Sequence, residues 1–112
     1  MKKIFVADDH PIFRKGLIEI ISAENDLEIV GESSDGLSAV NIIIEKKPDI
    51  AVLDIQMPQM DGFSVLKKIN ETGADTKVIF LTMHKEEDVF EQAMDLGVKG
   101  YVLKESASEE II

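Results

Sequence analysis

Five side chains able to do chemistry stand at the ends of short apolar segments of the sequence. They are Asp8 and Asp9 after the first segment, Asp54 and Thr82 at the ends of two later ones, and Lys104 after the last. Singly, each has an ordinary explanation, because a carboxylate after a strand often caps a helix and a lysine is usually a solvated charge. Together they supply a nucleophile, a set of cation ligands and two donors for equatorial oxygens, which are the groups that phosphoryl transfer requires.

The three carboxylates predict a bound cation, since clustered negative charges repel one another unless a cation lies among them. These side chains offer only oxygen ligands, which favours a hard cation, and Mg²⁺ with several retained waters fits better than a calcium cage. The calcium-loop pattern D-x-[DN]-x-[DN]-G is not met, because Gln56 and Pro58 occupy its third and fifth positions. The sequence has no glycine-rich phosphate loop, so a nucleotide is not the evident phosphoryl donor.

The two histidines, His10 and His84, have no partners at metal-ligand spacing in the sequence. A histidine in such a context is more often a helix cap or a surface residue than a ligand or a base. Neither is therefore predicted to be a metal ligand or a catalytic base.

Short apolar runs alternate with longer segments of helical periodicity along the chain, which is typical of a βαβ protein. Strands are predicted at residues 4–7, 27–31, 50–53, 78–81 and 101–103, and the second is alternating enough to be an edge strand. Helices are predicted to begin at Pro11, after Asp35, after Asp61 and at Glu86. The inward-facing residues predicted for the second helix are Leu37, Val40, Ile43 and Ile44.

The predicted fold class is an α/β fold with a doubly wound five-stranded parallel sheet, flavodoxin-like strand order 2-1-3-4-5 and helices on both faces. In this topology ligands bind outside the carboxyl ends of the strands, where the first and third strands part. All five candidate residues follow the carboxyl ends of predicted strands. The fold therefore predicts that they converge on one edge of the sheet.

The composition limits the possible functions. A chain of 112 residues is predicted to form one domain, residues 1–112. Its 22 acidic and 12 basic residues give a net charge of −10, which excludes a surface that contacts DNA directly. The lack of cysteine excludes thiolate zinc sites. No apolar run approaches the roughly 20 residues of a membrane span and no signal-peptide core is present, so a soluble, cytoplasmic protein without membrane partners is expected.

The last residues of the chain have the signature of a helix start. Ser106 and Glu109 form a capping-box pattern that predicts a fifth helix. The sequence stops at Ile112, before such a helix is complete. A truncated fifth helix, and a longer full-length protein, are therefore expected.

Four motifs together resemble the receiver domain of two-component response regulators, over essentially the whole chain. They are Asp8-Asp9, the run D-x-x-M-P-x-M-D-G that begins at Asp54, the Leu-Thr pair ending at Thr82, and the segment Gly-Tyr-Val-Leu-Lys ending at Lys104. Asp-Asp-His-Pro, Leu-Thr-Met-His and Gly-Tyr-Val-Leu-Lys-Glu-Ser further resemble the NarL/FixJ branch. Members of that branch usually carry a LuxR-type helix-turn-helix domain after the receiver, so a DNA-binding domain is expected in the full-length protein and is absent from this chain.

The resemblance implies that Asp54 is the phosphorylated residue, and that Lys104 and Thr82 are catalytic residues that hold phosphoryl oxygens. The implied Mg²⁺ ligands are Asp9 and Asp54 directly, Asp8 through water or as a secondary ligand, and Gln56 through its backbone carbonyl. Thr82 and Tyr101 are the implied switch residues. The positions implied to tune the lifetime of the phosphoryl group, with slow self-dephosphorylation as the expectation, are Gln56, Met83 and His84. The chain departs from the usual receiver pattern after the lysine, where Glu105 replaces a common proline.

The resemblance also implies partners. The phosphoryl donor would be a phosphohistidine on a sensor histidine kinase, with small acyl phosphates as substitutes. The domain would catalyse its own phosphorylation and dephosphorylation without turning over an external substrate. A homodimer on phosphorylation is possible in such a family, and DNA would be bound only through the missing domain.

Two other classes of protein share parts of this pattern. A haloacid-dehalogenase-type hydrolase also uses an aspartate nucleophile with Mg²⁺, but it needs a second aspartate two residues later, where Gln56 stands. A pseudo-receiver would bind partners without phosphorylation, which the full set of Asp9, Asp54, Thr82 and Lys104 disfavours.

Overall fold

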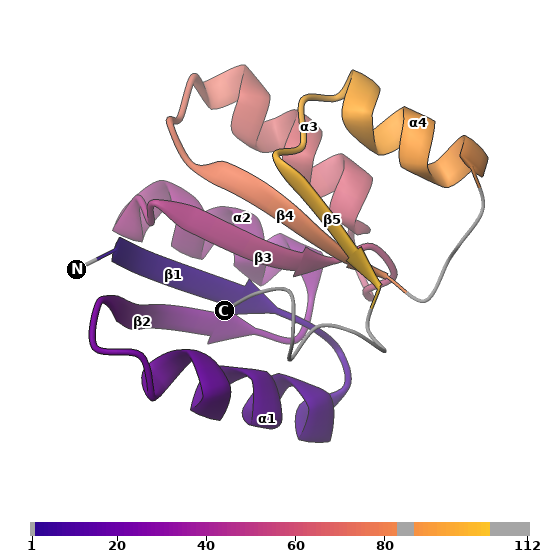
Figure 1. Cartoon of the computed structure of the whole chain (residues 1–112). Helices are drawn as coiled ribbons and strands as arrows, with labels where there is room; N and C mark the ends of the chain where they lie inside the picture. Colours follow the sequence, from indigo (N-terminus) through magenta and orange to yellow (C-terminus); the bar gives the residue numbers. More distant parts are fainter. Residues whose placement is uncertain (1, 83–86, 104–112) are drawn as a thin grey trace.

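The computed structural model of the protein describes residues 2–82 and 87–103. Within them, five strands form one sheet in the order β2-β1-β3-β4-β5, and all four strand pairings are parallel (Figure 1). The strands are β1 Lys2–Ala7, β2 Leu27–Ser33, β3 Ile50–Asp54, β4 Lys77–Thr82 and β5 Gly100–Leu103. The predicted fold class, strand order and edge position of β2 are confirmed.

The described helices cover both faces of the sheet. They are α1 Pro11–Ser22, α2 Gly36–Lys46, α3 Gly62–Thr72 and α4 Glu87–Asp95. Figure 1 shows α1 on one side of the sheet and α2 and α3 on the other. None of these helices is long and apolar enough to cross a membrane.

Two apolar clusters, one on each face, hold the layers together. Because side chains alternate along a strand, Ile4 and Val6 of β1 face α1, while Phe5 and Ala7 face α2 and α3. On the α1 face, Leu17 and Ile21 of the helix complete the cluster. On the other face the cluster is built from residues of α2, α3 and the strands that they cover. The rings of Phe63 and Phe80 pack edge to face there, with centroids 5.3 Å apart.

The helix starts follow the sequence signals. Asp35 accepts a hydrogen bond from the Ser38 N–H at 2.8 Å, and Asp61 accepts one from the Ser64 N–H at 2.9 Å. Both aspartates are therefore the predicted N-caps of α2 and α3. Pro11 occupies the first turn of α1, as predicted.

The inward face of α2 was predicted correctly at Val40 and Ile43 and wrongly at Leu37 and Ile44. Leu37 and Ile44 remain 49% and 45% exposed. Each follows a buried residue, Gly36 or Ile43, by one position, which rotates it about 100° around the helix axis. The pattern of apolar residues was wider than the face that the sheet covers.

Candidate functional site

The strand register brings the ends of β1, β3 and β4 together. Ala7 of β1 lies opposite Leu53 of β3, so Asp8 and Asp54 follow at adjacent positions. Asp54 lies opposite Leu81 of β4, and Thr82 comes next. Asp8, Asp54 and Thr82 are all buried, at 0%, 4% and 1% exposure. Two carboxylates and a hydroxyl thus end neighbouring buried strands, at the edge that the topology predicts.

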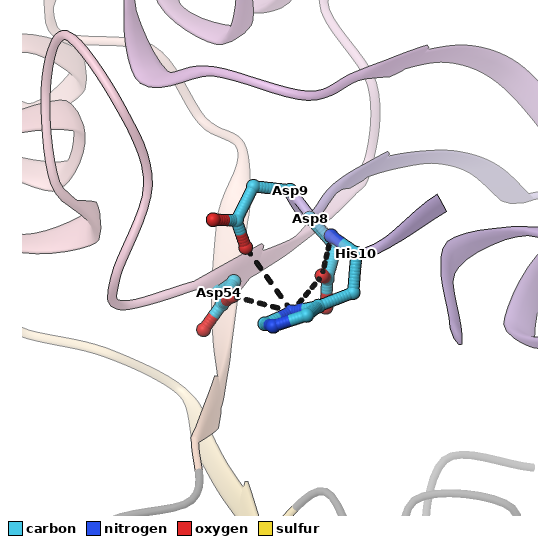
Figure 2. Close-up of side chains that lie close together, drawn as sticks. All are labelled: Asp8, Asp9, His10 and Asp54. Atoms are coloured by element: carbon cyan, nitrogen blue, oxygen red, sulfur yellow. Dashed lines mark hydrogen bonds and ion pairs between the residues drawn. The ribbon is translucent and has the colours of Figure 1, made fainter. Parts of the chain in front are cut away.

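Three carboxylates and an imidazole meet at this edge, as Figure 2 shows. One ligand atom from each of Asp8, Asp9, His10 and Asp54 lies within 4.8 Å of all the others. Asp9 is half-buried, with its side chain 32% exposed. We call these four residues the acidic cluster.

His10 is the member of the acidic cluster that was not predicted from the sequence to be a metal ligand. Its Nδ1 lies 3.1 Å from an oxygen of Asp8, 3.1 Å from one of Asp9 and 3.9 Å from one of Asp54. His10 does occupy the N-cap position of α1, but its side chain makes no capping hydrogen bond. The sequence offered His10 no partners at metal-ligand spacing, yet the structure places its ring beside three carboxylates, so the cluster offers a nitrogen as well as oxygens. The available signal was its position directly after two aspartates.

The turn from β1 into α1 is fixed by hydrogen bonds around Asp8. Its backbone N–H donates to the carbonyl of Ser33 on β2 at 3.0 Å, and its Oδ1 accepts from the His10 N–H at 2.8 Å. The Arg14 guanidinium donates to the Asp8 carbonyl at 2.6 Å and to Glu32 at 2.9 Å. Arg14 thus links the Asp8 backbone to Glu32 of β2 and holds the aspartate pair at the sheet edge. No local sequence motif predicted this role.

The loop after Asp54 is held by two close backbone approaches. The Gly62 N–H donates to the Ile55 carbonyl at 2.7 Å, and a Cβ at Gly62 would lie 2.8 Å from the Asp54 carbonyl oxygen. The Gly36 N–H, from the start of α2, donates to the Pro58 carbonyl at 3.2 Å. A Cβ at Gly36 would overlap the carbonyl oxygen of Met60. Glycine is needed at both positions because the backbones touch there.

Gln56 begins this loop with its side chain exposed. Its N–H donates to Asp54 Oδ1 across 3.4 Å. The predicted contribution of its backbone carbonyl to a metal site stays a prediction.

The remaining predicted site residues divide into two groups. Thr82 is buried at the end of β4, and Tyr101 of β5 is half-buried against the apolar cluster on the α2 and α3 face. The last described residue, Leu103, pairs with Thr82. Met83, His84 and Lys104 lie outside the described residues, and their roles stay predictions.

The chemistry of the donor set fits a divalent cation. Carboxylate oxygens and an imidazole nitrogen are all common ligands of such ions, and these four atoms, all within 4.8 Å of one another, can gather around one ion after small side-chain shifts. The carboxylate of Asp54 is at the same time buried and fixed at the end of β3. The fold and the site define a parallel α/β protein with a carboxylate cluster at the carboxyl ends of its central strands.

Comparisons with known proteins give the family. The sequence model of the response regulator receiver domain matches residues 4–112. The transcriptional regulatory protein YhcZ of Bacillus subtilis is 40% identical over 110 residues, which are 98% of this chain and 51% of that protein. The chain thus spans about half the length of the curated relatives it matches. It belongs to the response regulator receiver domain family.

Solved structures agree in fold. A DNA-binding response regulator of the LuxR family from Staphylococcus aureus is 35% identical with a TM-score of 0.94, over 99% of this chain and 92% of that one. The CheX-CheY-BeF3-Mg+2 complex from Borrelia burgdorferi is 28% identical with a TM-score of 0.86, over 91% of this chain and 77% of that one.

Proposed function

We propose that this receiver domain accepts a phosphoryl group on Asp54 from a phosphohistidine of a sensor histidine kinase, in a reaction that requires Mg²⁺. The observation that supports the proposal most is the carboxylate of Asp54 itself. It is 4% exposed, ends a central strand, and lies within 4.8 Å of ligand atoms from two further aspartates. A buried carboxylate beside two others costs stability unless a cation offsets the repulsion. Its position therefore favours a role in cation binding and in a reaction.

The transfer itself is a simple displacement. An oxygen of Asp54 forms a bond to phosphorus, the phosphorus–nitrogen bond of the phosphohistidine breaks, and its electron pair returns to the kinase imidazole. Asp9 and Asp54 would hold the Mg²⁺ directly, the Gln56 backbone carbonyl would be a further ligand, and Asp8 would act through water or as a secondary ligand. When bound, the cation neutralises charge on the carboxylates and the phosphoryl oxygens. Thr82 and Lys104 donate to those oxygens.

The phosphorylated domain acts as a switch. The phosphoryl group adds roughly −1.5 to −2 charges and up to about three charge-assisted hydrogen bonds. Inverting a 1:99 equilibrium requires about 5.5 kcal/mol of differential binding. Bonds from Thr82 and Lys104 that form only in the active state can supply it, and Tyr101 turns inward as Thr82 moves. Gln56, Met83 and His84 set the lifetime of the phosphoryl group.

The output of the switch lies outside this chain. We propose that residues 1–112 control a helix-turn-helix DNA-binding domain in a longer protein, that phosphorylation promotes a homodimer, and that the protein is cytoplasmic. Support comes from relatives about twice as long that are named as transcriptional regulators, and from the LuxR-family neighbour. The acidic receiver would not itself bind DNA, given its net charge of −10.

The test uses acetyl phosphate and Mg²⁺ with detection by intact mass. One phosphoryl adduct is expected in the parent, and it is expected to disappear in Asp54→Asn and when the cation is chelated. Labelling of Asp54→Asn, or none in the parent, would contradict the assignment of Asp54.

A further inference from the structure

We propose that the imidazole of His10 is a ligand of the cation in the acidic cluster, and that it makes the site prefer Mn²⁺ and Co²⁺ over Mg²⁺. The inference extends the proposed cation site of this receiver, on which it rests. It gives His10 a place in that site through a nitrogen ligand.

The distances around Nδ1 fit shared coordination. In octahedral geometry with bonds of about 2.1 Å, neighbouring ligand atoms lie about 3.0 Å apart and opposite ones about 4.2 Å apart. The Nδ1 of His10 lies 3.1 Å from oxygens of both Asp8 and Asp9. The contact with Asp8 is a hydrogen bond in this structure, and both distances also match neighbouring positions on one ion. The 3.9 Å to the Asp54 oxygen lies between the two limits, so a small shift of either side chain completes the set.

The side chain of His10 takes no part in capping α1. His10 sits at the N-cap of α1 in extended conformation, with φ −98° and ψ 101°, and its side chain caps no N–H of the helix. Its own N–H donates to Asp8 Oδ1 at 2.8 Å, which ties the residue to the cluster. The side chain is 60% exposed, but its ring is oriented so that Nδ1 faces the carboxylates (Figure 2). The ring is thus oriented by the site and not by the helix.

A nitrogen ligand changes which ion binds best. Affinity for sites with imidazole rises from Mn²⁺ through Co²⁺ to Ni²⁺ and Cu²⁺, whereas Mg²⁺ gains little from nitrogen and prefers carboxylate oxygens and water. The carboxylates of Asp9 and Asp54 bind either kind of ion. His10 is therefore the group that separates the two kinds.

The experiment measures metal binding alone, by calorimetric titration of the whole chain with Mg²⁺, Mn²⁺ and Co²⁺. In His10→Ala, binding of Co²⁺ is expected to weaken by roughly tenfold or more, and binding of Mg²⁺ by less than about threefold. Ile12→Ala is the matched control, because Ile12 begins the same helix, is 89% exposed and should change neither. Far-UV circular dichroism verifies that each variant is folded.

A second measurement reports the bond itself. Pulsed electron paramagnetic resonance of the Mn²⁺ form is expected to show coupling to an imidazole nitrogen in the parent and in Ile12→Ala, and none in His10→Ala. Equal affinity loss for all three ions, tighter Mg²⁺ binding in His10→Ala, or persistence of the nitrogen coupling would overturn the proposal. Failure of Asp54 to be phosphorylated, with this selectivity intact, would instead contradict only the proposed function.

Discussion

Two aspartates at opposite ends of β3 show how differently the two edges of the sheet use a carboxylate. Asp49 precedes the strand, is exposed, and accepts a hydrogen bond from the Lys3 N–H at 2.7 Å. Its backbone N–H donates to the Lys3 carbonyl on β1, and its carbonyl accepts from the Lys77 N–H on β4. Asp54, five residues later, is buried among other carboxylates. Asp49 thus holds the beginnings of neighbouring strands together at an exposed position. Asp54 adds negative charge to a cluster where a bound cation would offset it.

The glycines of the two edges differ in the same way. Gly73 ends α3 at the amino edge, the edge of the sheet where the strands begin. It has φ +72°, and nothing lies within 4 Å of a Cβ built on it. Gly36, at the carboxyl edge, leaves no room for a Cβ beside Met60. The amino edge uses glycine for its conformation, and the site edge uses it for close packing of two loops.

The largest expected difference between the edges is chemical. Asp54→Asn is expected to abolish phosphorylation by acetyl phosphate, because the nucleophile is lost. Asp49→Asn keeps an acceptor for the Lys3 N–H and should label as the parent does. Intact mass spectrometry measures both, and equal labelling of the two variants would erase the distinction between the aspartates.

The next effect concerns packing of the loops. Gly36→Ala is expected to cost about 2–4 kcal/mol of unfolding free energy, since the methyl group meets a backbone oxygen that cannot yield without moving the loop. Gly73→Ala has open space and should cost only about 1–2 kcal/mol for its left-handed backbone. Urea unfolding ranks the two, and a reversed order would show that the Gly36 contact relaxes easily.

A smaller effect is linked to the cation. At ten times its dissociation constant, Mg²⁺ is expected to stabilise the parent by about 1.4 kcal/mol. The gain should vanish in Asp9→Asn at the same Mg²⁺ concentration and persist in Asp49→Asn. Thermal unfolding with and without Mg²⁺ measures it, and a gain of the same size in all three proteins would point to a general salt effect.

The smallest effect belongs to the amino edge. Asp49→Ala removes the side-chain acceptor of the Lys3 N–H and is expected to cost about 0.5–1.5 kcal/mol, because water replaces the lost partner at an exposed position. The same urea unfolding experiment detects it. A loss of unfolding free energy larger than that of Gly36→Ala would contradict the expectation that substitutions at the amino edge cost less than those at the site edge.

The sequence predicted the sheet because apolar runs and caps are local signals. The strand order, the caps at Asp35 and Asp61 and the meeting of Asp8 with Asp54 all follow from such signals and the topology that they imply. The exposure of Leu37 and Ile44 was missed because helix periodicity defines a face only to within a residue or so.

The other missed features depend on tertiary geometry. The direction of the His10 ring follows from one turn and one rotamer, which residue type does not specify. Arg14 meets Glu32 across 18 positions of sequence, and Gly36 meets Met60 only once two crossovers have formed. Neither the Arg14–Glu32 pair nor the Gly36–Met60 pair is predicted by a local sequence pattern.

All four parallel strand pairings bear on the order of folding. Neighbouring parallel strands cannot be joined by a tight hairpin, so each pairing in the described sheet closes a long crossover. Asp8 and Asp54 therefore meet only after 46 residues of sequence separation have been closed into register. A fragment that lacks β1 or β3 lacks part of the acidic cluster, so cation binding to the complete cluster would report that the two strands have docked.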